Sequence, residues 1–318
     1  VRYWDVLIHN YLMKKGIVIP QKSSKNKSAK FEGAYVKDPQ VGMHKWVLSF
    51  DLNSLYPHLI MQYNISPETL YSQHKIKDME VDKLLDKKFD TSKLQKHHTI
   101  TPNGAIFTTN KKGFLPEIME SMYNDRVKYK NLMLKSKQEY ENTKDPKILK
   151  EISKYNNIQM AKKISLNSAY GAIGNNWFRY YNLLVAEAIT TSGQLSIRWI
   201  EKYLNQYLNK ILGTDNKDYV LASDTDSVYI TFDELVNKSF KTEGVASENE
   251  SGLQRERVVG FLDRLAREKI EPFIDKSYQS LAEYVSAYDQ KMSMKREVIA
   301  DKGIWTAKKR YILNAWDI

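Results

Sequence analysis

Two aspartates separated by one residue, Asp224 and Asp226, are the side chains best placed by spacing to hold a metal ion. Apolar, β-forming runs flank them at residues 220–222 and 228–230, which predicts a hairpin with both carboxylates at its tip. Carboxylates this close repel each other unless a cation lies between them, and oxygen-only ligands suit Mg²⁺. Asp and Ser are also ordinary turn residues, so the stretch alone favours an exposed turn.

A third carboxylate, Asp51, ends another apolar run at residues 46–50. A tight turn follows, and helical spacing resumes near residue 59. A strand that ends in Asp51 would direct its carboxylate and the next carbonyl, that of Leu52, toward one place, as a metal site requires. The alternative is that Asp51 caps the following helix.

Cationic side chains gather on a predicted pair of long helices, residues 116–142 and 148–173, which are separated by a break at Pro146. Helical spacing places several of them on shared faces. If the helices are antiparallel, they present one polar cluster: Arg126, Lys130, Lys163 and Asn167, with Tyr170 one turn further on. Three cations and an amide suit a triphosphate, whereas the alternative is two solvated amphipathic helices with ordinary surface lysines.

The remaining elements are predicted from apolar periodicity and turn residues. Further helices are expected at residues 1–16, 176–211 and 257–286. Further strands are expected at 17–19, 31–36, 293–299, 303–306 and 311–313, with a hairpin at 99–114. Loops or insertions are expected at 21–30, 71–98 and 237–254.

Composition narrows the class of protein. The 318 residues carry a formal charge of +11 and include 21 Tyr, which favours a nucleic-acid partner, although simple solubility charge is the alternative. No run of eighteen apolar residues and no signal peptide are visible, so we expect no membrane span and no secretion. Cys is absent, which excludes disulfides and thiolate metal sites and fits a reducing compartment.

Carboxylates on two separate strand ends, with a cationic helix pair between them in sequence, suit two-metal phosphoryl transfer. In such sites carboxylates hold two Mg²⁺ ions, and cations neutralise the leaving pyrophosphate.

These motifs resemble those of the family B DNA polymerases, most closely the replicative polymerases of T4-like tailed phages. The run DLNSLYP at 51–57 is similar to motif A, KISLNSAYG at 163–171 to motif B, DTDS at 224–227 to motif C, and KKRY at 308–311 to the basic motif that grips duplex. The four motifs stand in the family's order, and the resemblance covers nearly the whole chain.

The resemblance implies roles for individual residues. Metal ligands would be Asp51, Asp224, Asp226 and the Leu52 carbonyl, and Lys163 would also protonate the leaving pyrophosphate. The incoming nucleotide would be held by Arg126, Lys130, Lys163, Asn167, Ser54, Leu55, Tyr56 and Tyr170. Of these, Tyr56 would exclude a 2′-hydroxyl and Tyr170 would lie at the nascent base pair. Primer-template DNA would be contacted by Lys308, Lys309, Arg310, Tyr311 and Thr225. Glu297 lies in a family segment near the carboxylates.

Four positions depart from the family pattern. Ser223 stands in place of the usual glycine, His58 in place of a small residue, Lys295 where phage relatives carry an acid, and Ala169 in place of a larger apolar residue. None of them removes a required carboxylate, although Lys295 argues against an accessory metal there.

The resemblance implies an α+β palm, an antiparallel sheet backed by helices, with a two-helix fingers subdomain. We expect a connecting segment at 1–45, palm at 46–115 and 175–318, and fingers at 116–174, with the thumb and exonuclease regions outside an excised or naturally split chain. The implied partners are primer-template DNA, deoxynucleotides, two Mg²⁺ (or Mn²⁺), a sliding clamp and other replisome proteins, and any chain that carries the exonuclease and thumb. The implied location is the cytoplasm of an infected bacterium.

Two other functions stay open at this point. One is a non-catalytic nucleic-acid-binding piece of a split polymerase, which would not need Asp51, Asp226, Lys163 and Arg126 together. The other is a different Mg²⁺ enzyme with an Asp-x-Asp turn, such as a sugar transferase, which would not need the cationic helix faces or the 308–311 segment.

Overall fold

A five-stranded antiparallel sheet lies at the centre of the computed structural model, which describes residues 1–22, 32–240 and 248–317, without side-chain detail for 248–253. Its strand order is β4-β5-β1-β6-β7. The strands are β1 (Gly42–Leu52), β4 (Val220–Asp224), β5 (Ser227–Thr231), β6 (Met294–Ala307) and β7 (Arg310–Asp317). The apolar run that ends in Asp51 therefore forms the middle strand, buried between two neighbours.

The register of the sheet brings distant sequence motifs together at one end. Asp51 on β1 faces Ser227 on β5, and Ser227 also faces Asp224 on β4. On its other side Asp51 faces Lys295 on β6, after a bulge between Ser49 and Phe50. The C-terminal end of β1 and the β4–β5 turn thus lie at the same end of the sheet.

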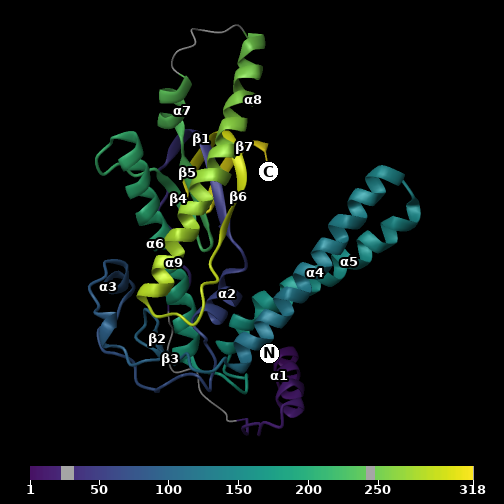
Figure 1. Cartoon of the computed structure of the whole chain (residues 1–318), viewed down its shortest axis with the longest axis vertical. Coiled ribbons are helices and arrows are strands. Elements are labelled where there is room, and N and C mark those ends of the chain that lie inside the picture. The colour runs from purple at the N-terminus through teal and green to yellow at the C-terminus, as the bar shows by residue number, and fades with distance from the viewer. Residues whose placement is uncertain (23–31, 241–247, 318) are drawn as a thin grey trace.

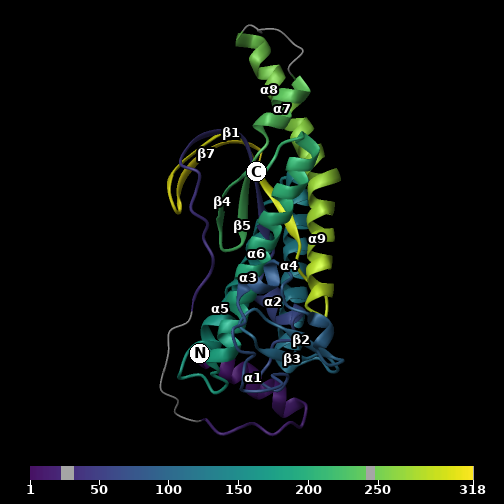
Figure 2. The same cartoon turned by 90° about the vertical axis from the view of Figure 1, so that its left-hand side faces the viewer.

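Helices cover one face of this sheet (Figure 2). They are α6 (Leu183–Leu212) and a nearly continuous rod of α8 (Glu248–Leu265), a π-helical turn (Ala266–Ile270) and α9 (Glu271–Tyr284). Trp199 on α6 donates a hydrogen bond to the carbonyl of Ser277 on α9 at 3.0 Å. Strand residues such as Leu48 and Phe50 bury their side chains in the main core that these helices complete.

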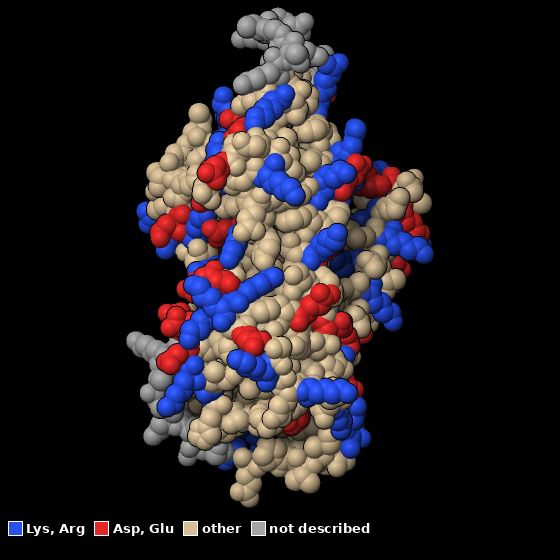
Figure 3. All heavy atoms as spheres, turned by 60° about the vertical axis from the view of Figure 1, so that its left-hand side comes forward, with Lys and Arg blue, Asp and Glu red and all other residues tan. Residues whose placement is uncertain are grey.

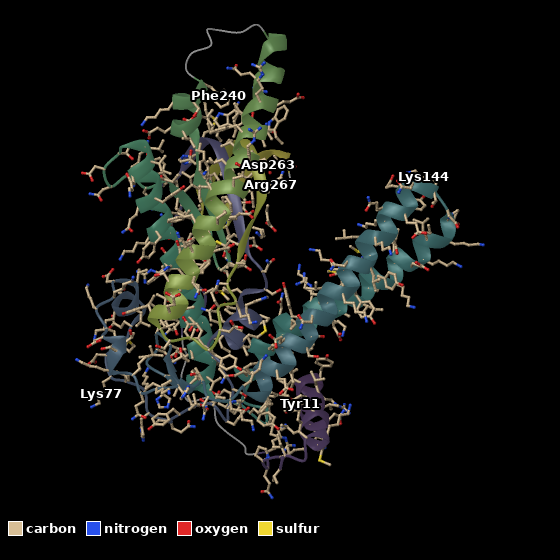
Figure 4. All side chains as sticks on the ribbon, viewed as in Figure 1. Tyr11, Lys77, Lys144, Phe240, Asp263 and Arg267 are labelled. Carbon is tan, nitrogen blue, oxygen red and sulfur yellow. The ribbon has the colours of Figure 1, made fainter. Side chains whose placement is uncertain are left out.

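A helical hairpin projects away from the sheet and its covering helices (Figure 1). It consists of α4 (Phe114–Thr143) and α5 (Pro146–Ile173), packed against each other along their length. Asp145 caps α5 by accepting a hydrogen bond from the Lys147 amide at 2.9 Å, and Pro146 occupies the first turn, where proline is tolerated. Lys144 lies at the tip of this arm (Figure 4).

Several short elements complete the fold, some at the base of the arm and others, such as the helix at residues 81–85, against α6. They are α1 (Arg2–Lys14), α2 (Leu55–Gln62), α3 (Val81–Leu85), a 3₁₀ turn (Thr91–Lys93) and the two-stranded sheet of β2 (His98–Ile100) and β3 (Ile106–Thr108). Helix α2 contacts both α4 and α5. Trp4 on α1 donates a hydrogen bond to Ser168 Oγ on α5 at 2.9 Å, so the root of the arm is also tied to α1.

The structure confirms the predicted fold, with mixed helices and strands, an antiparallel sheet and a pair of long helices, and it confirms the hairpins at 99–114 and 220–230. Several boundaries were wrong. Residues 17–19 form no strand, and residues 32–36 form only one bridge, at Val36, while residue 31 lies outside the described part. The helix expected at 176–211 begins at Leu183, because Asn182 caps it by accepting hydrogen bonds from two backbone amides.

Two further predictions were wrong near the C-terminus. The loop expected at 237–254 is helical wherever it is described, in α7 (Asp233–Phe240) and from Glu248 onward in α8. The strands expected at 293–299 and 303–306 are one strand, β6, whose partner is β7. The loop expected at 21–30 lies almost wholly outside the described residues.

Across the described ranges, no helix combines the length and apolar character needed to cross a membrane.

Candidate active site

Asp51 and Asp226 lie side by side at the end of the sheet. The Leu52 amide donates a hydrogen bond to the Asp226 carbonyl at 2.9 Å, which joins the end of β1 to the β4–β5 turn. Ser227 Oγ donates to Asp51 Oδ1 at 2.8 Å. Both carboxylates are half-buried, so the sheet holds them in place while one side stays open to solvent.

The pKa values of Asp51 and Asp226 are both raised, which indicates that the two carboxylates are partly desolvated, repel each other and would be stabilised by a counterion. Burial raises the pKa of Asp51 to about 6, and the charges of Asp226 and Glu297 add to the rise, opposed by the Ser227 hydrogen bond and by Lys163. Burial also raises the pKa of Asp226, with further contributions from Asp224 and Glu297. A cation between the two side chains would relieve this repulsion.

Asp224, the third predicted carboxylate, is directed toward a different neighbour. Its Oδ1 lies 3.2 Å from Lys309 Nζ and accepts a hydrogen bond from Thr225 Oγ1 at 3.0 Å. Thr225 has a positive φ of 58°, a left-handed conformation that is unusual for a β-branched residue. The turn therefore separates Asp224 from Asp226, and the former faces the β6–β7 turn.

The donor set fits a hard divalent cation. Within the described part of the chain, no three His, Cys, Asp or Glu side chains converge closely enough to form a complete metal cage. Mg²⁺ is usually held by only one or two carboxylates, with water and substrate phosphates completing its octahedron. Asp51 and Asp226 meet that requirement.

The arm contributes cations that face these carboxylates. Lys163 on α5 is exposed, and its charge opposes the rise in pKa of both Asp51 and Asp226. Arg126 on α4 is half-buried and donates a hydrogen bond to Ser54 Oγ at 3.0 Å, whereas Lys130 and Asn167 are exposed. The antiparallel packing predicted for the two helices is confirmed, and Lys163 and Arg126 both lie near the end of β1.

Two tyrosines form a wall where α5 of the arm meets α2. The rings of Tyr56 on α2 and Tyr170 on α5 are 4.7 Å apart between centroids, at 37°. Burial raises the pKa of Tyr56 to about 12, so its hydroxyl stays protonated. Leu55 is buried, which leaves only its backbone for any ligand, and Ser54 has a positive φ of 51° at the start of α2.

The predicted DNA-contacting residues lie in and beside the β6–β7 turn. Lys308 pairs with Asp38 at 3.1 Å and Lys309 with Asp224 at 3.2 Å, while Arg310 is exposed at the start of β7. The Tyr311 hydroxyl lies 2.6 Å from that of Tyr229, and its ring stacks on Trp305. This aromatic stack fixes the hairpin beside the carboxylates.

The four positions that depart from the family pattern are accommodated without disturbing the carboxylates. Ser223 is buried in β4, and Ala169 is buried in α5. His58 is buried with its ring 4.5 Å from that of Tyr123 on α4, and its Nδ1 is hydrogen-bonded to the Ser54 carbonyl. Lys295 pairs with Glu271 at 2.7 Å.

Sequence reasoning missed two kinds of contact. Ser227 hydrogen-bonds Asp51, and the Tyr35 carbonyl accepts a hydrogen bond from the Thr225 amide at 3.0 Å. The position of Ser227 directly after Asp226 was a usable signal, since a small hydroxyl residue at the start of β5 faces the neighbouring strand. Nothing in the local sequence around Tyr35 indicates its partner.

Comparisons with known proteins agree with this geometry. Residues 2–251 match the model of DNA polymerase family B. The chain is 34% identical to the DNA-directed DNA polymerase of Escherichia phage RB69 and 33% identical to that of Enterobacteria phage T4, in each case over all of this chain and 39% of the relative. It is also 29% identical to the DNA polymerase delta catalytic subunit of Candida albicans, over 69% of this chain and 19% of the relative.

The chain thus spans about two fifths of the length of the phage relatives that it matches. The match to the family model extends over most of the chain and includes the carboxylates of β1 and of the β4–β5 turn, together with the cationic arm. The chain belongs to DNA polymerase family B.

Proposed function

We propose that this chain carries the nucleotidyl-transfer centre of a DNA-directed DNA polymerase and adds deoxynucleotides to a primer 3′ end. The observation that carries the proposal is the adjacency of Asp51, at the end of β1, and Asp226, in the β4–β5 turn, with Lys163 of the arm facing both. Relatives named DNA-directed DNA polymerase support it.

Asp51, Asp226 and the Leu52 carbonyl would hold two Mg²⁺, for which Mn²⁺ is a substitute, with Asp224 nearer the primer end. Bound there, such ions would activate an attacking oxygen and stabilise a leaving oxygen. The residues of the chain set the geometry: Ser227 fixes the Asp51 carboxylate, and the Leu52–Asp226 backbone hydrogen bond fixes the distance between the strands.

Arg126, Lys130, Lys163 and Asn167 would bind the triphosphate. Charge-assisted hydrogen bonds from these side chains neutralise the phosphates and orient the α-phosphorus toward the primer. Lys163 is suited to donate a proton to the departing pyrophosphate, because its ammonium group lies near the carboxylates that hold the metals.

The nucleoside would rest against the wall of Tyr56 and Tyr170. Tyr56 would lie under the deoxyribose and exclude a 2′-hydroxyl, Tyr170 would contact the nascent base pair, and the backbone at Ser54 and Leu55 would contact the phosphates. The ring-to-ring packing of the two tyrosines supports a rigid wall at this position.

Primer-template duplex would lie along the β6–β7 hairpin and be held by Lys308, Lys309, Arg310 and Tyr311, with Thr225 near the primer end. The further partners implied by the family are a sliding clamp, other replisome proteins, and any chain or region that carries the exonuclease and thumb. The setting would be the cytoplasm of an infected bacterium, as expected for a relative of phage polymerases.

Single-nucleotide incorporation into a labelled primer-template tests the proposal. We expect Mg²⁺-dependent extension by the chain and a loss of at least about 10³-fold in Asp226→Asn, since the carboxylate acts on the reacting atoms. Asp215→Asn, which removes an exposed carboxylate in the loop after α6, is the matched control and should extend normally. Duplex binding without extension, at high protein concentration and with either metal, would instead identify a non-catalytic piece that requires partner chains.

A further inference from the structure

The free edge of β4 is covered by an extended segment, residues 35–40, which we call the strap. Since β4 is the outermost strand on its side of the sheet, its edge would otherwise expose unpaired backbone groups. The strap donates to and accepts from this edge through three backbone hydrogen bonds: Gln40 N to Leu221 O at 2.8 Å, Lys37 N to Ser223 O at 3.0 Å, and Thr225 N to Tyr35 O at 3.0 Å.

The third of these hydrogen bonds reaches the turn that carries the carboxylates. Thr225 is held at a φ of 58°, a left-handed conformation that is unfavourable for a β-branched residue and persists only where surrounding contacts hold it. The Tyr35 carbonyl is one such contact. Because Thr225 lies between Asp224 and Asp226, its backbone conformation determines how the two carboxylates are directed.

The strap is anchored by a largely buried cation, Lys37. Its Nζ lies 2.5 Å from Glu201 Oε1 on α6 and 2.7 Å from Asp218 Oδ2, just before β4. The Lys37 and Glu201 side chains are only 13% and 16% exposed, so this is not an ordinary solvent-screened ion pair.

One face of α6 makes the remaining contacts with residues 33–37. Gln194, Arg198 and Glu201 are spaced i, i+4 and i+7 and therefore share that face. Gln194 Nε2 donates to the Gly33 carbonyl at 2.7 Å, and the Arg198 guanidinium lies 5.6 Å from the centroid of the Tyr35 ring. Lys37 supplies the only direct charge pairing between the strap and α6 among the described residues.

Removing Lys37 would leave an uncompensated charge. Burial raises the pKa of Glu201, and the Lys37 charge opposes that rise. Burial alone would lower the pKa of Lys37, yet Glu201 and Asp218 raise it above its ordinary value. Truncation of one partner of a buried pair is costly because the other is left desolvated. Without Lys37, Glu201 keeps only the weaker compensation of Arg198, and the strap loses its ion pair with α6.

We propose that Lys37 is a positioning residue for nucleotidyl transfer, which acts through the strap on the backbone of the Asp224–Asp226 turn. The inference rests on the proposed function for its catalytic consequence, although not for the structural link between Lys37 and the turn.

The test compares Lys37→Met with Lys37→Arg, which keeps the cation, and with the milder Glu201→Gln. Lys202→Met is the matched control, because Lys202 neighbours Glu201 on α6 but pairs with Asp86 on another side of the helix. Two readouts are needed: hydrogen–deuterium exchange of the Thr225 amide without ligands, and single-nucleotide incorporation with separate kcat and KM for the deoxynucleotide.

We expect the Thr225 amide to exchange at least about tenfold faster in Lys37→Met, since the hydrogen bond to Tyr35 opens more often. We expect kcat to fall roughly tenfold or more with little change in KM, because misdirected carboxylates affect the reacting geometry rather than binding. Lys37→Arg should restore both readouts, Glu201→Gln should be intermediate, and Lys202→Met should resemble the unsubstituted chain. If Lys37→Met does not fold, Glu201→Gln carries the same comparison.

Unchanged exchange at Thr225 in a folded Lys37→Met or Glu201→Gln variant would overturn the inference. So would faster exchange with unchanged kcat, because the strap would then hold the turn without affecting the reaction. If the unsubstituted chain incorporates no nucleotide, the proposed function fails, and the exchange measurement still decides whether Lys37 fixes the turn.

Discussion

At the scale of single residues, Asp51 is an example of a site residue whose charge makes the folded state less stable. Burial and the neighbouring Asp226 raise the pKa of Asp51 to about 6, so the folded state disfavours the ionised carboxylate that a metal requires. A group whose pKa is raised on folding contributes stability at low pH and loses it as the pH rises through the folded pKa. Above pH 6 the charged Asp51 therefore opposes folding.

Asp51→Asn should stabilise the chain at pH 7.5, because Asn has a similar shape, keeps an acceptor for Ser227 and carries no charge. A pKa rise of about two units corresponds to roughly 3 kcal/mol, which we reduce to about 1–2 kcal/mol because the side chain is partly solvated. The gain should shrink as the pH falls from 6 to 4, where Asp51 is protonated in the folded state. Urea unfolding at pH 7.5 and 4.5 measures the difference.

Asp86→Asn is the control of opposite sign. Hydrogen bonds from Lys88 and Lys202 lower the pKa of Asp86 to about 2, so its charge favours folding above the ordinary pKa of an aspartate. This variant should lose stability at pH 7.5. A destabilised Asp51→Asn at pH 7.5 would show that Lys163 already compensates the Asp51 charge in the free chain.

At the scale of elements, the β6–β7 hairpin presents its cations unequally. Lys308 and Lys309 are paired with Asp38 and Asp224, whereas Arg310 has no carboxylate partner within the described ranges. A cation that is free of carboxylates can neutralise a DNA phosphate without first losing another partner. Arg310 is therefore the residue of this turn best suited to contact the backbone of a duplex.

Arg310→Ala should reduce the magnitude of the slope of log K against log [salt] for duplex binding by about 0.9, the value for one phosphate contact. Fluorescence anisotropy of a labelled duplex between 50 and 300 mM salt gives the slope. Lys77→Ala is the control, because Lys77 is exposed on the opposite side of the molecule from the arm (Figure 4). A slope that changes for Lys77→Ala and not for Arg310→Ala would place the duplex elsewhere.

The elements that could be predicted from sequence are those with long, regular periodicity. Helices α4 and α5 have 30 and 28 residues, and a proline marks the break between them. Strand β6 was predicted as two strands because Asp301, Lys302 and Gly303 are typical of a turn. In the structure Asp301 is buried and accepts a hydrogen bond from Asn314 on β7 at 2.7 Å, while Gly303 lets the Trp305 ring lie against the backbone.

Sequence patterns located the segments that carry the candidate site, whereas the contacts between those segments needed the fold. Strand-end positions identified Asp51, Asp224 and Asp226, yet only the antiparallel register shows that Ser227 faces Asp51. The ion pair that anchors the strap joins Lys37 to residues more than 160 positions away, beyond any local pattern. The pairing of Lys309 with Asp224 likewise depends on how two hairpins lie beside each other.

At the scale of the whole molecule, the surface charge is dispersed on the face seen in Figure 3, whereas the shape is dominated by one projecting arm. On the face shown in Figure 3, acidic and basic side chains are interspersed, so the net charge of +11 is not concentrated in one patch there. The arm, in contrast, extends away from the sheet and contacts the body mainly through α2 and α6 at its base (Figure 1). A long helical hairpin with a small base can swing relative to the sheet while few packing contacts change.

The arm should therefore close toward the sheet when a triphosphate and a divalent cation bind. The anionic triphosphate would lie between Arg126 and Lys163 of the arm and the cation that we propose Asp51 and Asp226 hold, and it would attract both sides. The chain has no cysteine, so Lys144→Cys at the arm tip and Lys302→Cys on β6 allow specific labelling with a fluorophore pair. Energy transfer between the labels should rise when the correct deoxynucleotide is added with Mg²⁺ and primer-template.

In Arg126→Ala the midpoint of this rise should move to roughly tenfold higher nucleotide concentration, since a charged hydrogen bond contributes about 1.5–3 kcal/mol. Lys135→Ala, an exposed cation further along α4, should leave the midpoint unchanged. If transfer stays constant at saturating nucleotide in a variant pair that still extends primers, the arm is rigid and binds the triphosphate in the position seen here.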